Sequence, residues 1–141
     1  MTESLAETFN ELVVMDLFYL AKNIYFSRPE IEKYLNHFEN LNIISKNKNY
    51  DFLLWYLKQI IKDNETVDKY LDILSLNLEN VEFIIKHFGI DRNINYKKIF
   101  LDCFKNDYLK EAIIIYNSFK SKDLLDTSLW KNIKIYCLEN L

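Results

Sequence analysis

The chain has 141 residues but only one glycine, Gly89, and one proline, Pro29. Average usage would give roughly ten glycines and seven prolines in a chain of this length. Tight hairpins between β-strands depend on residues that tolerate positive φ angles, and glycine serves there by default. The composition therefore predicts an all-α fold whose helices are joined by short turns of Asn, Asp, Ser and Lys.

The scarcity of glycine also excludes several kinds of active site. A P-loop and a dinucleotide-binding fingerprint both need several glycines in one loop, so that backbone N–H groups can approach a phosphate. A Gly-x-Ser-x-Gly nucleophile elbow needs two. Because Gly89 is the only glycine, none of these motifs can be present, and we expect no cofactor.

Metal and acid–base chemistry find little support either. The two histidines, His37 and His87, occur in no Glu-x-x-His or His-x-x-x-His spacing, and no close pair of ligands anchors a zinc site. We expect both histidines at the surface. The sequence predicts no catalytic residues and no metal ligands, so the chain is not expected to be an enzyme.

Charge and cysteine usage indicate the surroundings. Residues 1–90 hold nine Lys/Arg against fourteen Asp/Glu, and residues 91–141 hold nine against seven. The acidic first part disfavours a nucleic-acid footprint there. Cys103 and Cys137 lie in apolar helical patterns typical of buried thiols, which favours a reducing, cytoplasmic compartment. The acidic N-terminus and an apolar run broken by Asp16 predict neither a signal peptide nor a membrane span.

Apolar periodicity predicts about eight helices in a single domain, residues 1–141. A long first helix covers about 5–25, opened by a capping box of Ser4 and Glu7. The second starts at Ser27 and is followed by a short extended piece at 43–44 and an exposed loop at 45–49. Gly89 is expected to end a helix in the left-handed conformation. The remaining helices are expected over about 50–62, from 64 or 66 to 74, from 77 or 80 to 88, over 96–104 and 109–119, and after 126.

The prediction of the architecture starts from segment 96–119, whose pattern predicts two helices joined by a polar turn at 105–107. A hairpin of this kind cannot bury both apolar stripes alone and needs similar neighbours. Two offsets recur: 81–88 aligns with 112–119 at a shift of 31, and 101–106 aligns with 135–140 at a shift of 34. We therefore expect three or four helical hairpins stacked right-handedly, as a helical-repeat array or an orthogonal bundle.

The segment Asp107-Tyr-Leu-Lys-Glu-Ala-Ile-Ile-Ile-Tyr116, with residues 135–140 after it, resembles a pentatricopeptide or tetratricopeptide repeat over roughly residues 80–141. It is also similar to the degenerate ankyrin-type repeats common in large-virus and parasite proteins. The position that reads a base in pentatricopeptide repeats holds Trp130 here, which argues against RNA readout. The resemblance implies a binding surface without catalysis.

Residues 27–45 also resemble the recognition helix and first wing strand of a winged-helix domain. That resemblance implies nucleic-acid binding. The helix carries Glu30, Glu32 and Glu39 against Arg28 and Lys33, and phosphates would repel such a surface. We keep nucleic-acid binding as the third hypothesis.

Aromatic residues are the remaining signal, since ten Tyr, ten Phe and two Trp exceed what a core strictly needs. The leading hypothesis is a protein–protein interaction module with a helical face of aromatic and Lys side chains. The second is a small acidic inhibitor or immunity-type protein that blocks a basic enzyme surface. The candidate partner-binding residues are Trp55, Tyr56, Tyr96, Lys97, Tyr116, Trp130 and Tyr136.

Overall fold

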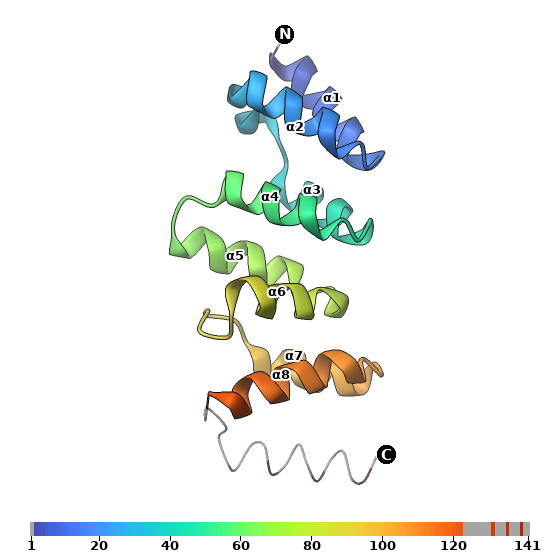
Figure 1. Ribbon diagram of the computed structural model, residues 1–141, viewed down its shortest axis with the longest axis vertical. Coiled ribbons are helices and arrows are strands. Elements are labelled where there is room, and N and C mark those ends of the chain that lie inside the picture. Colours follow the sequence, from blue (N-terminus) through green and yellow to red (C-terminus); the bar gives the residue numbers. More distant parts are fainter. Residues whose placement is uncertain (1, 123–130, 132–134, 136–138, 140–141) are drawn as a thin grey trace. The chain divides into compact units, whose positions relative to one another are not determined.

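A computed structural model describes residues 2–122 and the single residues 131, 135 and 139. Across these residues the regular structure is entirely helical, with eight α-helices, two short 3-10 helices and no strand. The fold is therefore all-α, as the scarcity of glycine predicts. The helices in chain order (Figure 1) are α1 (Thr2–Val14), α2 (Phe18–Ser27), η1 (Pro29–Tyr34), α3 (His37–Lys46), α4 (Tyr50–Ile60), α5 (Asn64–Leu74), η2 (Leu78–Asn80), α6 (Val81–Phe88), α7 (Tyr96–Lys105) and α8 (Leu109–Ser121).

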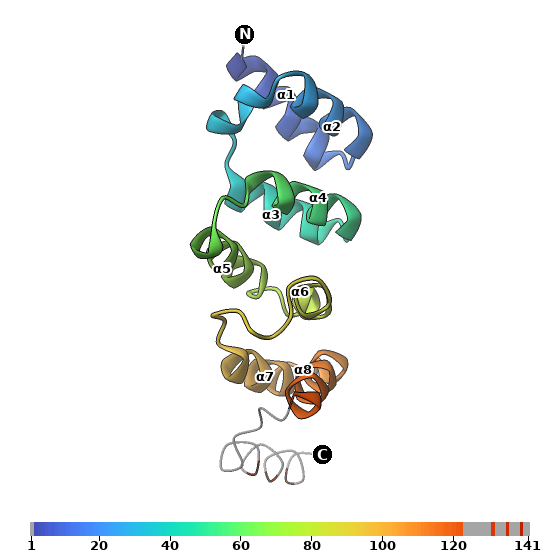
Figure 2. The ribbon, with the colours of Figure 1, turned by 60° about the vertical axis from the view of Figure 1, so that its left-hand side comes forward.

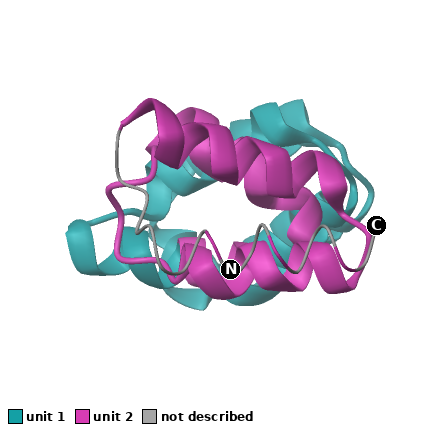
Figure 3. Cartoon of the chain, turned by 90° about the horizontal axis from the view of Figure 1, so that it is seen from below, with its two compact units in different colours: residues 1–70 teal, residues 71–141 magenta. Residues whose placement is uncertain are grey.

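The chain divides into two compact units, which Figure 3 colours separately. Unit 1 comprises residues 1–70 and unit 2 residues 71–141, so the boundary falls within α5. The assignment of residues 1–141 to a single domain stays a prediction.

Three helical pairs, α1–α2, α3–α4 and α7–α8, are joined by very short turns (Figures 1 and 2). Each turn contains one residue with positive φ: Asp16 at 57°, Lys48 at 57° and Asp107 at 64°. In the first turn, Leu17 N donates to Leu12 O at 2.9 Å and Asp16 N donates to Val13 O at 3.1 Å. This is the Schellman pattern, which normally uses glycine and here uses aspartate.

The turn of the α7–α8 hairpin repeats that pattern, because Tyr108 N donates to Cys103 O at 2.8 Å and Asp107 N to Phe104 O at 3.4 Å. The predicted hairpin at 96–119, with its polar turn, is confirmed. In unit 1 the turn residues Asp16 and Lys48 lie 32 positions apart, close to the offsets of 31 and 34 in the sequence. Membership of a helical-repeat family stays a prediction.

The single helix predicted over 5–25 is wrong. The chain forms α1 and α2 instead, because Asp16 adopts the left-handed conformation that ends α1. The capping box of Ser4 and Glu7 is wrong too, since α1 already begins at Thr2.

The prediction for residues 27–49 is also corrected. Ser27 ends α2 rather than capping the next helix, and η1 is followed by an extended residue, Leu35. The Asn36 side chain then accepts a hydrogen bond from Glu39 N at 3.2 Å and starts α3. The expected extended piece at 43–44 and the wing strand are therefore helical, and the loop shrinks to 47–49.

Helices α4, α5 and α6 fall within their predicted ranges. Asn49 and Asn77 cap α4 and η2 through their side-chain oxygens. Asp63, rather than Asn64 or Thr66, opens α5: its carboxylate accepts from Thr66 N at 2.9 Å while Asp63 N donates to the Thr66 hydroxyl at 3.1 Å. The two exchanges form a capping box.

Each unit has an apolar core. The most deeply buried side chains of unit 1 include Phe9, Ile31, Leu41, Ile44, Phe52, Leu53, Tyr56, Leu57 and Ile60. In unit 2 the core cluster comprises Val81, Ile90, Tyr96, Ile99, Phe100, Cys103, Ala112 and Ile115.

The predicted cap of the last helix at 126 or 127, and its stripe of Leu129, Trp130, Ile133 and Cys137, lie outside the described residues. Lys131, Ile135 and Glu139 are helical and exposed.

Candidate functional site

Helix α2 exposes large apolar side chains instead of burying them. Only one of its ten residues is charged, Lys22. Ala21 and Tyr25 are buried in unit 1, whereas Tyr19 is 76% exposed and Phe26 is 64% exposed. Large apolar side chains grouped on a surface mark an interaction site more often than scattered ones do.

Trp55 of α4 joins the α2 side chains into one surface. Its indole lies 5.8 Å from the Phe26 ring and 5.4 Å from the Tyr25 ring, centroid to centroid. At the other end of α2, the Phe18 ring lies 4.7 Å from the Tyr19 ring. We call the set Phe18, Tyr19, Lys22, Phe26 and Trp55 the aromatic surface.

Lys22 lies in the middle of this surface. Its ammonium nitrogen lies 4.4 Å from the centroid of the Phe18 ring and 5.3 Å from that of Trp55. Both distances are within the range of a cation–π interaction. The Lys22 side chain is half-buried, and within residues 2–122 no carboxylate lies at ion-pair distance from it. Within residues 2–122 this cation therefore has two rings beside it and no carboxylate partner.

Of the predicted partner-binding residues in unit 1, Trp55 belongs to the aromatic surface and Tyr56 does not. Tyr56 is fully buried, so its ring cannot touch a partner. Adjacent residues of a helix point in different directions, and in α4 the tyrosine faces inward.

The candidates in unit 2 also separate by burial. Tyr96 is 5% exposed and its hydroxyl donates to Gly89 O at 2.9 Å, so it fastens the loop before α7 instead of facing solvent. Lys97 and Tyr116 are exposed. Trp130 and Tyr136 lie outside the described residues.

Sequence reasoning missed Phe18, Tyr19, Lys22 and Phe26. The signal was present, because residues 17–27 contain many apolar residues and one charge. A single helix over 5–25, however, gives residues 18–26 no exposed side of their own. The break at Asp16 leaves them on a short second helix with an exposed side.

A buried polar cluster in unit 1 is the second candidate. Asn40 Nδ2 donates to the Tyr56 hydroxyl at 3.0 Å and to Asn10 Oδ1 at 3.1 Å, and His37 Nδ1 lies 2.7 Å from the same hydroxyl. A hydroxyl can donate one hydrogen bond and accept two, so the tautomer of His37 decides which of the two groups donates in this contact. Burial lowers the pKa of His37, and the Glu32 carboxylate, 3.8 Å from Nε2, opposes that shift less strongly. The expectation of a surface histidine is wrong for His37, whereas His87 on α6 is exposed.

Glu32 completes this cluster. It accepts from the Tyr25 hydroxyl at 3.3 Å and lies 3.2 Å from Lys62 Nζ. Burial, and then the Glu32 charge, raise the pKa of Tyr25 to about 12, so the phenol stays protonated. The cluster joins several helices and its polar atoms are satisfied by one another, which fits a structural role better than a catalytic one.

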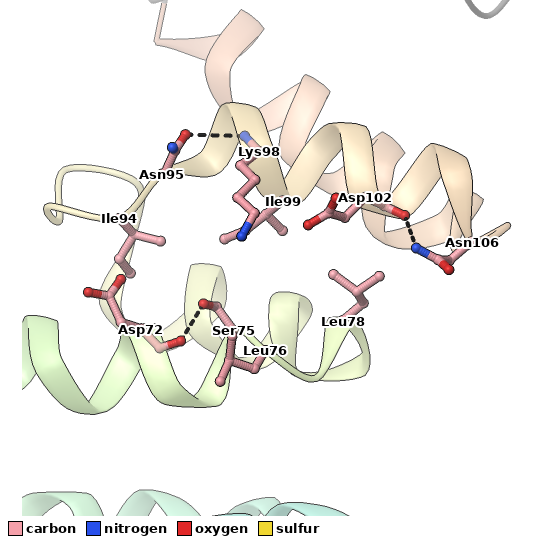
Figure 4. Close-up of a pocket in the computed structure, with 10 residues that line it drawn as sticks. All are labelled: Asp72, Ser75, Leu76, Leu78, Ile94, Asn95, Lys98, Ile99, Asp102 and Asn106. Atoms are coloured by element: carbon pink, nitrogen blue, oxygen red, sulfur yellow. Dashed lines mark hydrogen bonds between the residues drawn. The ribbon is translucent and has the colours of Figure 1, made fainter.

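A pocket of about 350 Å³ in unit 2 is the third candidate. The end of α5 and the outer side of α7 line it, and the charged ends of Lys98 and Asp102 project into it (Figure 4). Several of its polar groups are already used within the chain: Asn95 Oδ1 accepts from Lys98 N at 3.1 Å, and Ser75 Oγ donates to Asp72 O at 2.7 Å. Few groups therefore remain to orient a ligand.

Cys103 is fully buried in the core of unit 2, and burial raises the pKa of its thiol to about 11. It is therefore a poor nucleophile at neutral pH. In the part of the chain that the structure describes, no group of three or more His, Cys, Asp or Glu side chains could hold a metal ion.

No family model, curated protein or solved structure matches the chain. Among the described helices, none has the length and apolar character needed to cross a membrane.

Proposed function

We propose that this chain is a non-enzymatic protein-recognition module and that the aromatic surface is its contact site. The observation that carries the proposal is the exposure of two rings of α2, Tyr19 beside Phe18 and Phe26 beside Trp55. Lys22 lies against both Phe18 and Trp55. Aromatic side chains are enriched at the energetic centres of protein interfaces, and charged side chains are rare there.

Energetics favour this use of the surface. Burying one large apolar side chain contributes about 1.5–3 kcal/mol. Folding of unit 1 does not provide this stabilisation for Tyr19 or Phe26, because both side chains keep most of their surface in water. A partner that covers both rings and the half-buried Trp55 would gain several such increments at once. Rings also lose little rotamer freedom on binding.

Site-specific photo-crosslinking tests the proposal. A benzophenone amino acid replaces Tyr19 in one variant and Leu76 in another, and each is expressed in the native host before irradiation. Leu76 is a matched control, because it is apolar, 80% exposed and located in unit 2. We expect a defined protein adduct from position 19 and none of the same mass from position 76. Equal adducts from both positions, or none from position 19, would overturn the proposal.

A further inference from the structure

Lys22 indicates the chemistry of the partner. We infer that the aromatic surface binds an amphipathic helix of another protein, which places a carboxylate against Lys22 and apolar side chains against Tyr19 and Phe26. This inference rests on the proposed function and specifies the partner.

Spacing along α2 supports a helical partner. Tyr19, Lys22 and Phe26 stand at positions i, i+3 and i+7, which share one side of an α-helix. The two rings are thus about 10 Å apart along the axis, with the cation between them. A second helix packed along α2 repeats its own side chains with the same period, so it can bring an apolar residue, a carboxylate and a second apolar residue to these three positions.

Because binding removes water from Lys22, the partner needs an acidic side chain next to it. Its ammonium already lies against Phe18 and Trp55, and a partner that covers Tyr19 and Phe26 removes much of its remaining water. Burying an unpaired charge is costly. Because no carboxylate within residues 2–122 pairs with Lys22, we expect the compensating charge on the partner.

The position of Lys22 on α2 also argues against a second copy of this chain as the partner. Pairing two α2 helices antiparallel about a two-fold axis would set Tyr19 of one copy against Phe26 of the other. Lys22 lies midway between them in the sequence, so the two ammonium groups would meet near the axis. Like charges in such an interface are repulsive.

Nucleic acid fits less well than an acidic helix. Single strands do stack on exposed rings, but their backbone needs a track of cations. The aromatic surface offers a single cation, and unit 1 as a whole has eight Lys/Arg against eleven Asp/Glu. Charge thus favours a partner with an isolated carboxylate over a polyanion.

The test is a selection from a displayed library of random peptides, each long enough for about four helical turns. The baits are the wild-type chain and its Lys22→Glu variant, and Tyr19→Asp serves for counter-selection. Peptides enriched on wild type should share an Asp or Glu between apolar residues at helical spacing. Peptides enriched on Lys22→Glu should carry Lys or Arg at that place. For one wild-type peptide, fluorescence anisotropy should show about ten- to hundredfold weaker binding to Lys22→Glu.

The failures are distinguishable. Peptides that need Tyr19 but carry no acid, or that bind Lys22→Glu equally well, overturn the inference and leave the proposed function standing. Lack of any enrichment over Tyr19→Asp counts against both. Sedimentation showing a dimer that Tyr19→Asp dissociates, or gel shift of an oligodeoxythymidine that needs Tyr19, would replace the acidic helix with a second copy or a nucleic acid.

Discussion

Gly89 has a backbone conformation, φ 75° and ψ −172°, that is essentially restricted to glycine. It ends α6 and its carbonyl accepts the Tyr96 hydroxyl. The expected left-handed cap is thus corrected: φ is positive, but ψ lies far from the left-handed helical region. The chain keeps its single glycine at a position that aspartate or lysine cannot occupy as they do in the hairpin turns.

Replacing Gly89 with alanine should lower the free energy of unfolding by about 1–3 kcal/mol. Apart from Gly89 and its two chain neighbours, no residue comes within 4 Å of the place for a Cβ, so the penalty comes from the backbone alone. Urea denaturation measures it. As a control, Lys48→Gly at φ 57° should raise stability by up to about 1 kcal/mol, since lysine is strained there. An unchanged Gly89→Ala protein would contradict the assignment.

His37 makes stability depend on pH. Its pKa is lowered from 6.5, mainly by burial, so at mildly acidic pH the unfolded chain binds a proton that the folded chain resists. The free energy of unfolding should therefore have its full value above pH 6.5 and decrease as the pH drops below 6.5.

His37→Asn keeps a hydrogen-bonding group near the place of Nδ1 and removes the titration, so its stability should fall less between about pH 7.5 and about 5.5. His87→Asn is the matched control, because His87 is exposed, and it should follow the wild-type curve. The urea concentration at the unfolding midpoint, measured for each variant across the pH series, tests this prediction. Parallel curves for wild type and His37→Asn would exclude His37 as the source.

At the scale of elements, helix starts rely on asparagine. Asn95 caps α7 by accepting from Lys98 N at 3.1 Å. Asn95→Ala should cost about 1 kcal/mol, and Asn95→Asp should retain most of the cap. Asn93→Ala, two residues earlier in the same exposed loop, should have almost no effect. Thermal unfolding followed by circular dichroism measures all three, and equal losses at 93 and 95 would argue against capping.

The Tyr56 hydroxyl links elements of unit 1, since it meets Asn40 and His37 of α3 from its place on α4. Tyr56→Phe leaves both partners without it and should cost about 1–3 kcal/mol. Tyr19→Phe removes an exposed hydroxyl and should be neutral, which makes it a matched control. If the two variants unfold at the same urea concentration, the cluster contributes nothing to stability.

Periodicity predicted the α7–α8 hairpin and α4, because each stripe there buries one clear side. It failed at Asp16, where apolar residues continue on both sides of a break. It also failed at η1, where the apolar spacing suits a helix but Asn36 starts a new one. The backbone turn at Asp16 and the side-chain cap of Asn36 decide these two positions, whereas the apolar pattern reports only burial.

At the scale of the whole molecule, composition was enough for the fold class. It also suggested an aromatic and lysine-bearing helical face, and Trp55 lies on such a surface. It could not separate Trp55 from the buried Tyr56, because a ring suits a core and an interface equally well. Nor could it find Tyr19 or Phe26, whose exposure depends on the turn at Asp16.

The central claim is that the exposed rings of α2 serve binding and not folding. The most direct measurement is the affinity of the protein crosslinked at position 19 for the wild-type chain, Tyr19→Asp and Leu76→Asp, by calorimetry, with folding checked by circular dichroism. We predict at least about thirtyfold weaker binding for Tyr19→Asp and wild-type affinity for Leu76→Asp, with all three equally folded. Equal affinity for all three, or a Tyr19→Asp chain that no longer folds, would contradict the claim.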